Sequence, residues 1–233
     1  MTLTPIHKND LPRALARMTS FLEPGRVAAR VLARISETVA AFDAPYDTRT
    51  HRREAVDLAS RLGIATLDEA PAAAFSWDGH VIRVRSEAYV LIHEVAHWQI
   101  APPDRRGMVD FGLGAGPETG RVAEAAAARC VSDAAKEQEE LLASLLGILW
   151  EATLGQPAIH AFVEQNWLEA WDRPSAADQF RRTVEELVSR GLIDANGVPY
   201  AGSAATADIS IRNSGHASAE TSTMADDGPS LGK

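Results

Sequence analysis

The sequence predicts a mainly α-helical fold with a small β-hairpin or sheet, which places it in the α+β class. Apolar residues recur at helical spacing through most of the chain, and only one short segment has the character of strands. Hydrophobic residues make up 45% of the chain and charged residues 24%, as in an ordinary globular protein. The length of 233 residues suits one domain of moderate size.

Three helices are predicted in the first part of the chain, over residues 11–22, 27–42 and 53–62. The first has apolar side chains three and four positions apart, as at Leu11 and Leu15. Pro24-Gly25 separates it from the second, because this pair interrupts helices.

A β-hairpin is predicted over residues 75–84. Asp78-Gly79 is a favoured turn pair, and Val81, Ile82 and Val84 after it suit a strand. The hairpin is the one part of the chain that we expect to be β-structure.

The next helix is predicted over residues 86–100. Ser86 is expected to cap it, with Glu87 in its first turn near the positive end of the helix dipole. Pro102-Pro103 cannot continue the helix, so a loop is expected over residues 102–120.

The C-terminal half is predicted to be helical over residues 121–154, 158–167 and 175–190, with a break near Ser132 in the first of these. Asn196-Gly197 marks a turn near the end of the folded part.

The composition also predicts the domain organisation. Residues 201–233 are rich in small and polar side chains, which cannot bury enough surface to offset the entropy of ordering. We therefore expect one domain over residues 1–200, followed by a disordered tail over residues 201–233.

Charge and cysteine content exclude several classes of protein. The chain has 23 basic and 32 acidic residues, a net charge of −9, so no nucleic-acid partner is expected. The single cysteine, Cys130, excludes an intrachain disulfide and a multi-cysteine zinc site, and it favours a reducing, cytoplasmic location. No secretory signal and no apolar stretch of about 18 residues is present, so no membrane association is expected.

One motif indicates chemistry, the H-E-x-x-H sequence His93-Glu94-Val95-Ala96-His97. Residues four apart share a helix face, so the two imidazoles can bind one metal ion, and Glu94 can reach a metal-bound water or the substrate. The alternative is a pair of ordinary histidines in an amphipathic helix. However, the mostly apolar flanks predict a buried helix, in which polar side chains need partners. We expect a metal site within a zincin-like pair of helices.

A third protein ligand is needed to complete such a site. The extended motif of the metzincins is absent, because Ile100 and Pro103 stand where it has glycine and histidine. A distant carboxylate is therefore expected. Glu140 is favoured because it precedes the most apolar stretch of the chain, and Glu137, on nearly the same helix face, is the alternative.

Two further residues are weaker candidates for the third ligand. Asp110 lies in the loop soon after His97, and His160 lies near a predicted helix start. The glutamates of segment 137–140 could instead be solvated side chains at a helix start, where the helix dipole favours negative charge. We expect this alternative to apply to at least two of the three glutamates.

The motif is followed at short distances by further distinctive blocks, namely Trp98, Ile100-Ala101, Arg105-Arg106, Val109-Asp110-Phe111-Gly112 and Pro117-Glu118. With these blocks, residues 86–120 resemble the elongation factor P hydroxylase family. That family has an H-E-[IL]-[AS]-H-W block, a short basic linker, and a D-F-G block followed by Pro-Asp-Gly. A weaker similarity extends through Glu140 to Gly155-Gln156-Pro157, where the family has a glutamate and then Gly-x-Pro, and this is a second reason to prefer Glu140.

The resemblance implies a non-haem Fe(II) site made of two histidines and a carboxylate, here His93, His97 and Glu140, with Glu94 outside the ligand set. It implies an oxidoreductase that uses molecular oxygen to hydroxylate a modified lysine, so elongation factor P or a similar protein is the expected substrate and partner. After Asp-Phe-Gly the family carries an aromatic-rich stretch, whereas this chain has Leu113-Gly114-Ala115-Gly116. We therefore expect a divergent member with a reshaped pocket.

Two other functions are compatible with the motif. With Zn(II) on the same ligands, the protein would be a metallohydrolase, most simply a peptidase, with Glu94 as general base; no histidine or tyrosine stands out as an oxyanion stabiliser. A structural metal in a partner-binding helical domain is less favoured, because structural zinc sites usually have four protein ligands. Two histidines and a carboxylate serve iron and zinc alike, so the ligands leave the metal open.

Overall fold

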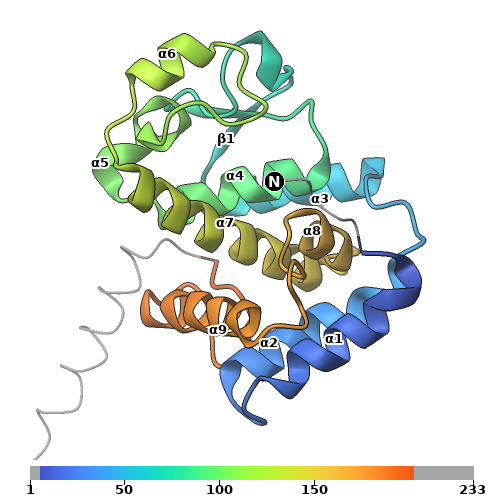
Figure 1. Ribbon diagram of the computed structural model, residues 1–233. Coiled ribbons are helices and arrows are strands. Elements are labelled where there is room, and N and C mark those ends of the chain that lie inside the picture. The colour runs from blue at the N-terminus through green and yellow to red at the C-terminus, as the bar shows by residue number, and fades with distance from the viewer. Residues whose placement is uncertain (1–5, 202–233) are drawn as a thin grey trace, which may run out of the picture.

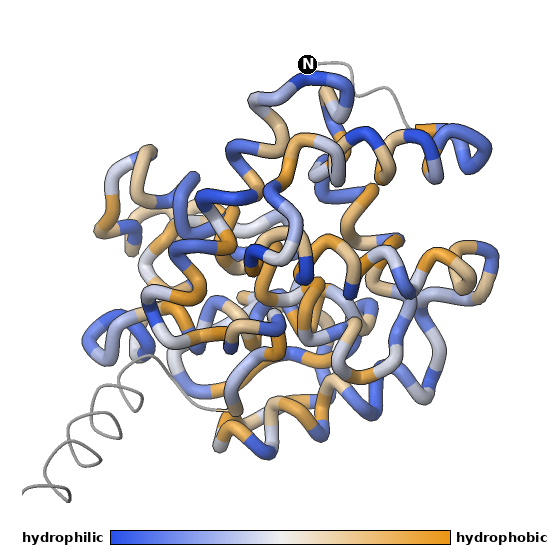
Figure 2. Tube along the Cα trace, turned by 90° about the horizontal axis from the view of Figure 1, so that it is seen from below, coloured by the Kyte–Doolittle hydropathy of each residue, from blue (hydrophilic) through white to orange (hydrophobic). Residues whose placement is uncertain are grey.

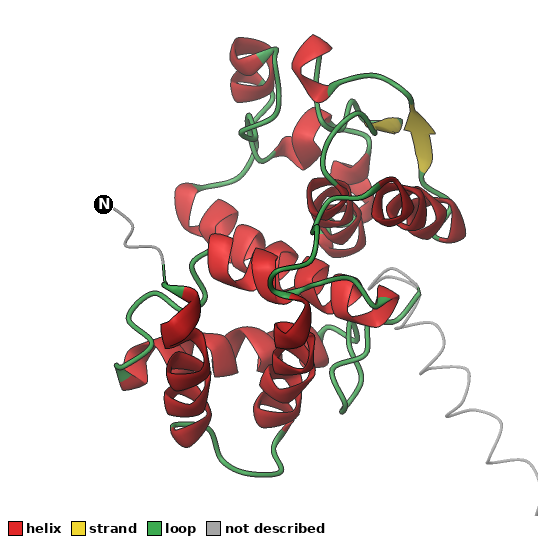
Figure 3. Ribbon diagram, turned by 90° about the vertical axis from the view of Figure 1, so that its right-hand side faces the viewer, coloured by secondary structure: helices red, strands yellow, loops and turns green. Residues whose placement is uncertain are grey.

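The structure is a computed structural model that describes residues 6–201. As predicted, the described chain is mainly helical with one small sheet at its edge (Figure 1, Figure 3). The tail predicted over residues 201–233 lies outside the described residues, apart from Ala201. Within residues 6–201, none of the helices combines the length and the apolar character that crossing a membrane requires.

The α-helices are α1 (Leu11–Ser20), α2 (Val27–Ser36), α3 (Arg49–Arg61), α4 (Ala88–Ile100), α5 (Pro103–Arg106), α6 (Val122–Ala127), α7 (Asp133–Leu154), α8 (Ile159–Glu164) and α9 (Pro174–Ser189). Short 3-10 helices cover Lys8–Asp10, Glu37–Ala41, Pro71–Ala73 and Val109–Gly112. The strands are β1 (Ala65–Leu67) and β2 (Val81–Arg83). The predicted break near Ser132 is confirmed, because Ser132 caps α7 by accepting a hydrogen bond from the Ala135 amide at 3.2 Å.

The sheet differs from the predicted β-hairpin. β1 and β2 pair in parallel, with Ala65 opposite Val81. The chain does turn at Asp78-Gly79, but only one antiparallel bridge forms there, between Trp77 and Ile82. The hairpin prediction is therefore wrong in its main pairing, because three residues of β1 are too few to show an alternating pattern.

The start of α4 also differs from the prediction. The helix begins at Ala88 with Glu87 at the N-cap position, so Ser86 lies outside it and does not cap it. The hydroxyl of Ser86 donates instead to the Glu87 carboxylate at 3.2 Å. The backbone amide of Ala88 donates to Asp47 at 3.1 Å, so a residue distant in sequence replaces the local cap.

The helix α7 is the centre of the fold. Its 22 residues pack against α4 on one side and against α2, α8 and α9 on the other (Figure 1). Residues 142–151 of α7 are all buried, as expected for a helix that is surrounded by other helices. Hydrophobic and hydrophilic stretches alternate along much of the chain trace (Figure 2).

The helices α4 and α7 run antiparallel and in close contact. His97 lies opposite Glu139 and Glu140, whereas the backbone of His93 lies opposite Gly147. A Cβ atom at Gly147 would lie 3.5 Å from the Cα atom of His93, which is van der Waals contact. This packing places the histidines of α4 against the acidic first half of α7.

A buried carboxyl group gives a first test of this core. Glu151 on α7 is 5% exposed, and burial, with a contribution from Glu164, raises its pKa well above the usual 4.5. Because the folded-state pKa exceeds the unfolded value, Glu151 does not lower the free energy of unfolding below about pH 4.5, where it is protonated in both states. As the pH rises toward its folded pKa, Glu151 increasingly destabilises the fold. The variant Glu151→Gln should therefore be more stable than the parent at about pH 8, on the order of 1 kcal/mol.

Thermal unfolding of both proteins at about pH 4 and about pH 8 measures this effect, which corresponds to about 2–4 °C in Tm. Glu164→Gln, which removes only the neighbouring charge, should give a smaller gain. Equal gains for Glu151→Gln at the two pH values would contradict the assignment.

Candidate metal centre

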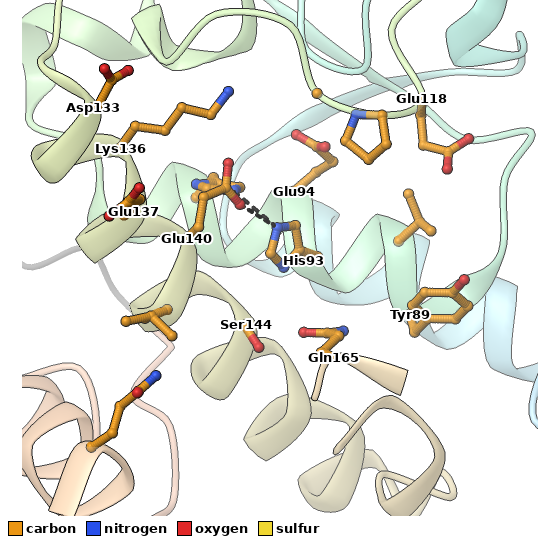
Figure 4. Close-up of a pocket in the computed structure, with 16 residues that line it drawn as sticks. Tyr89, His93, Glu94, Glu118, Asp133, Lys136, Glu137, Glu140, Ser144 and Gln165 are labelled. Atoms are coloured by element: carbon orange, nitrogen blue, oxygen red, sulfur yellow. Dashed lines mark hydrogen bonds and ion pairs between the residues drawn. The ribbon is translucent and has the colours of Figure 1, made fainter. Parts of the chain in front are cut away.

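His93 and His97 of α4 and Glu140 of α7 form one compact cluster. The Nε2 atoms of the two histidines are 3.0 Å apart, and each lies 3.4 Å from Oε2 of Glu140. In Figure 4, Glu140 reaches from α7 toward His93 across the space between the helices. The structure therefore brings together the three residues that the sequence predicts as ligands.

The spacing of these donor atoms fits a single metal ion. Two atoms that each bind an ion at about 2.1 Å are about 3.0 Å apart at a right angle and about 3.4 Å apart at the tetrahedral angle. The two imidazole planes are 89° apart, so their Nε2 atoms converge from different directions. One divalent ion would satisfy all three donors at once.

The charges around the cluster favour a bound cation. Burial acts to lower the pKa of His97, but the carboxylates of Glu139 and Glu140 outweigh it and raise the pKa to about 10. Burial acts to raise the pKa of Glu140, but the two histidines outweigh it and lower the pKa well below its usual range. Carboxylates that hold a proton on His97 in this way would equally attract a metal ion.

Glu94 lies beside the cluster without joining it. Its side chain projects from α4 toward the part of the cavity wall that carries Glu118 (Figure 4). Burial raises the pKa of Glu94 to about 7, against the opposing effect of His97. A carboxyl group with a pKa near neutrality is suited to accept or release a proton.

The cluster opens into a cavity of about 930 Å³ between α4, α7 and the loop before α6. Most of the charged side chains around it are acidic; besides His93 and His97, Lys136 is the one basic residue in this lining. The acidic residues are Glu94, Glu118, Asp133, Glu137 and Glu140. Tyr89, Val90 and Leu141 add apolar surface, so the cavity suits a ligand with an apolar stem and a positive charge.

The alternative ligands predicted from the sequence do not join the cluster. Glu137 lines the cavity, but it is not among the three donors that converge. Asp110 is buried and accepts a hydrogen bond from the Thr119 hydroxyl at 2.8 Å. His160 on α8 stacks on Phe42, with ring centroids 4.6 Å apart. Asp110 and His160 therefore have structural contacts of their own.

Asp110 and Phe111 form a turn that reaches His97. Both have left-handed backbone conformations, with φ of 40° and 54°, which residues other than glycine adopt rarely. The Phe111 ring stacks against the His97 ring, with centroids 5.7 Å apart, and against Trp77 at 5.3 Å. The Asp-Phe-Gly block therefore shapes the wall behind a candidate ligand.

Two residues near the cluster are missed by the sequence reasoning. Tyr89 lines the cavity, although no tyrosine stands out in the sequence, and burial raises its pKa to about 12. Its position one helical turn before His93 is the signal that identifies it. Glu139 lies behind His97, but within a run of acidic residues nothing local distinguishes it from a solvated side chain.

Comparisons of the chain with protein-family models, with curated proteins and with solved structures returned no match. The resemblance of residues 86–120 therefore depends on the motifs alone. In the structure, the H-E-x-x-H motif and Pro117-Glu118 line the same cavity, and Phe111 stacks on His97.

We expect the purified protein to bind one divalent ion through the cluster. His93→Ala, His97→Ala and Glu140→Gln should each weaken Co(II) affinity by more than about 100-fold, because removing a ligand costs more than disturbing its surroundings. Competition with a chromophoric chelator measures these affinities. Glu137→Gln and His160→Gln serve as controls and should bind as the parent does. If Glu137→Gln loses as much affinity as Glu140→Gln, the assignment of the third ligand is wrong.

Proposed function

We propose that the protein is a metal-dependent enzyme, a non-haem Fe(II) hydroxylase similar to the elongation factor P hydroxylases. One observation carries this proposal: the separate blocks that resemble this family meet at the cluster. Phe111 stacks on His97, and Arg105 forms an ion pair with Glu139 beside the same ring. This arrangement supports the proposal because residues of the resembling blocks contact a candidate ligand directly.

The donor set suits this chemistry. His93, His97 and Glu140 would hold the ion from one side, which leaves positions for oxygen and substrate toward the cavity. Fe(II), when bound, supplies the redox chemistry that activates molecular oxygen. The balanced reaction inserts one oxygen atom into a substrate C–H bond, and an external two-electron reductant with two protons converts the other atom to water.

The other side chains of the cavity have roles of their own. Glu94 is placed to move a proton at the edge of the ligand set, and the apolar surface of Tyr89 and Leu141 limits the access of water. The acidic wall at Glu118 and Glu137 would attract a cationic group. These features support a modified lysine side chain of a protein as the substrate, with elongation factor P or a similar protein as the partner.

The test uses protein that is purified anaerobically and loaded with Fe(II). With oxygen and ascorbate, it should add one oxygen atom to the modified lysine of elongation factor P, detected by mass spectrometry with isotopically labelled oxygen. Glu140→Gln should reduce turnover by more than about 100-fold, and Glu137→Gln should retain the ability to hold the metal. If no oxygen-dependent product forms across a panel of lysine-modified proteins, the hydroxylase proposal fails.

A zinc-dependent metallohydrolase, acting as a peptidase, is the second candidate. The observation that favours it is Glu94, whose pKa of about 7 suits a general base beside the metal, together with Tyr89 at the same cavity. In that case Glu94 would take a proton from the attacking water, and the Tyr89 hydroxyl would lie on the substrate side.

A single variant separates the two candidates. Glu94→Gln should keep Co(II) affinity within about threefold of the parent, because Glu94 is outside the ligand set. Our proposal predicts that the Zn(II)-loaded parent does not cleave a panel of fluorogenic peptides. Peptide cleavage by the parent that Glu94→Gln abolishes, with metal retained, would favour the peptidase instead.

A further inference from the structure

We infer that Glu139 and Arg105 position the imidazole of His97 for metal binding, and that Arg105 connects this contact to the turn at Asp110 and Phe111. The inference rests on the metal centre of the proposed function, but not on which reaction that centre supports. Glu139 and Arg105 are therefore positioning residues, since they act through His97.

The two nitrogens of the His97 ring face different carboxylates. Nε2 lies toward Glu140 in the cluster, whereas Nδ1 lies 3.7 Å from Oε1 of Glu139 on the opposite side. The side chains of His97 and Glu139 are only 4% and 9% exposed. Nδ1 and Oε1 are both buried, and neither has another hydrogen-bond partner among the described residues.

Two unpaired buried polar atoms that face one another are the natural partners of a hydrogen bond. A small rotation of the His97 ring would bring Nδ1 within donating distance of Glu139. A proton on Nδ1 leaves the lone pair of Nε2 free for a metal, so this contact selects the tautomer that a ligand requires. The contact also orients the ring and makes Nε2 a stronger ligand for a metal ion.

Arg105 holds Glu139 in the required orientation. Its guanidinium group forms an ion pair with Oε2 of Glu139, which leaves Oε1 directed at His97. A second guanidinium nitrogen donates to the backbone carbonyl of Phe111 at 2.9 Å. Arg105 is itself 13% exposed, so this ion pair is largely shielded from water.

The turn at Phe111 completes the support of His97. The Phe111 ring covers one face of the imidazole, while Glu139 faces its edge, and Arg105 contacts both supporting residues. Asp110 fixes the turn from the other side, because its carboxylate accepts hydrogen bonds from the Thr119 hydroxyl at 2.8 Å and the Trp77 amide at 3.4 Å.

His93 lacks the corresponding support. Its Nδ1 atom is also buried, but no hydrogen-bond partner faces it among residues 6–201. A carboxylate outside the cluster therefore faces His97 but not His93. Among the glutamates of α7 other than Glu140, removal of Glu139 alone should weaken metal binding.

The experiment compares Glu139→Gln with Glu137→Gln in the full chain. Both variants remove one negative charge from the same helical turn of α7 while keeping the shape of the side chain, but only Glu139 faces His97. The Co(II) dissociation constant should rise about 10- to 100-fold in Glu139→Gln and remain within about threefold of the parent in Glu137→Gln. The visible absorption of bound Co(II) should change in Glu139→Gln alone, because it reports the geometry around the ion.

Thermal unfolding of the metal-free variants separates positioning from misfolding. If Glu139→Gln unfolds cooperatively at the temperature of measurement and yet has the affinity and spectrum of the parent, the inference is wrong. The same conclusion follows if Glu137→Gln weakens binding as much as Glu139→Gln.

A double-mutant cycle tests the role of Arg105. Arg105→Gln should weaken Co(II) binding, and the double variant with Glu139→Gln should bind within about threefold of Glu139→Gln alone, because both changes remove the same support. Fully additive effects would show that Arg105 does not act through Glu139. A parent that binds no Co(II) would overturn the metal centre and this inference together, whereas failure of hydroxylation alone would overturn only the proposed function.

Discussion

The contact between Gly147 of α7 and the backbone of His93 brings two buried helices so close together that only a methyl group would fit between them. At this separation, side chains about two turns away along α7 reach the histidines of α4. Residues 142–150 of α7 are buried among α4, α2, α8 and α9, so the core sets the distance between Glu140 and the two imidazoles. The geometry of the cluster therefore follows from packing, and the ligands need little rearrangement to meet an ion.

The same packing buries several ionisable groups, which is costly unless their charges are balanced. The positive charge of Arg105 balances the negative charge of Glu139. A protonated His97 balances the negative charge of Glu140 in the same way. A divalent ion would replace that proton with two positive charges. The ion and Arg105 together would then balance the charges of Glu139, Glu140 and the ionised form of Glu94. A bound cation would therefore lower the cost of burying these carboxylates, and it would contribute to the stability of the site.

The parts of this structure that the sequence predicts are those that depend on local patterns. Helical periodicity identifies most of the helices, and the spacing of His93 and His97 places them on one face. Glu140 is predictable because the apolar stretch that follows it packs against α4 and holds Glu140 beside the two histidines. The parts that are missed depend on contacts between distant residues. The cap of α4 comes from Asp47, β1 pairs with a strand beyond an intervening segment, and Glu139 is defined by Arg105, 34 positions away.

The loop after Phe111 shows how a metal site and a substrate pocket can vary separately. Its two ends are tied to the site, since Phe111 stacks on His97 and Asp110 accepts a hydrogen bond from Thr119. Between these ends the chain runs through residues 113–116, where it departs from the hydroxylase family, and Gly116 forms part of the cavity wall. None of these four residues supplies a donor atom to the cluster, and the backbone amide of Leu113 donates to the Asp110 carbonyl at 2.9 Å. A change of residues 113–116 would therefore alter the wall at Gly116 while the donor atoms of the cluster stay in place.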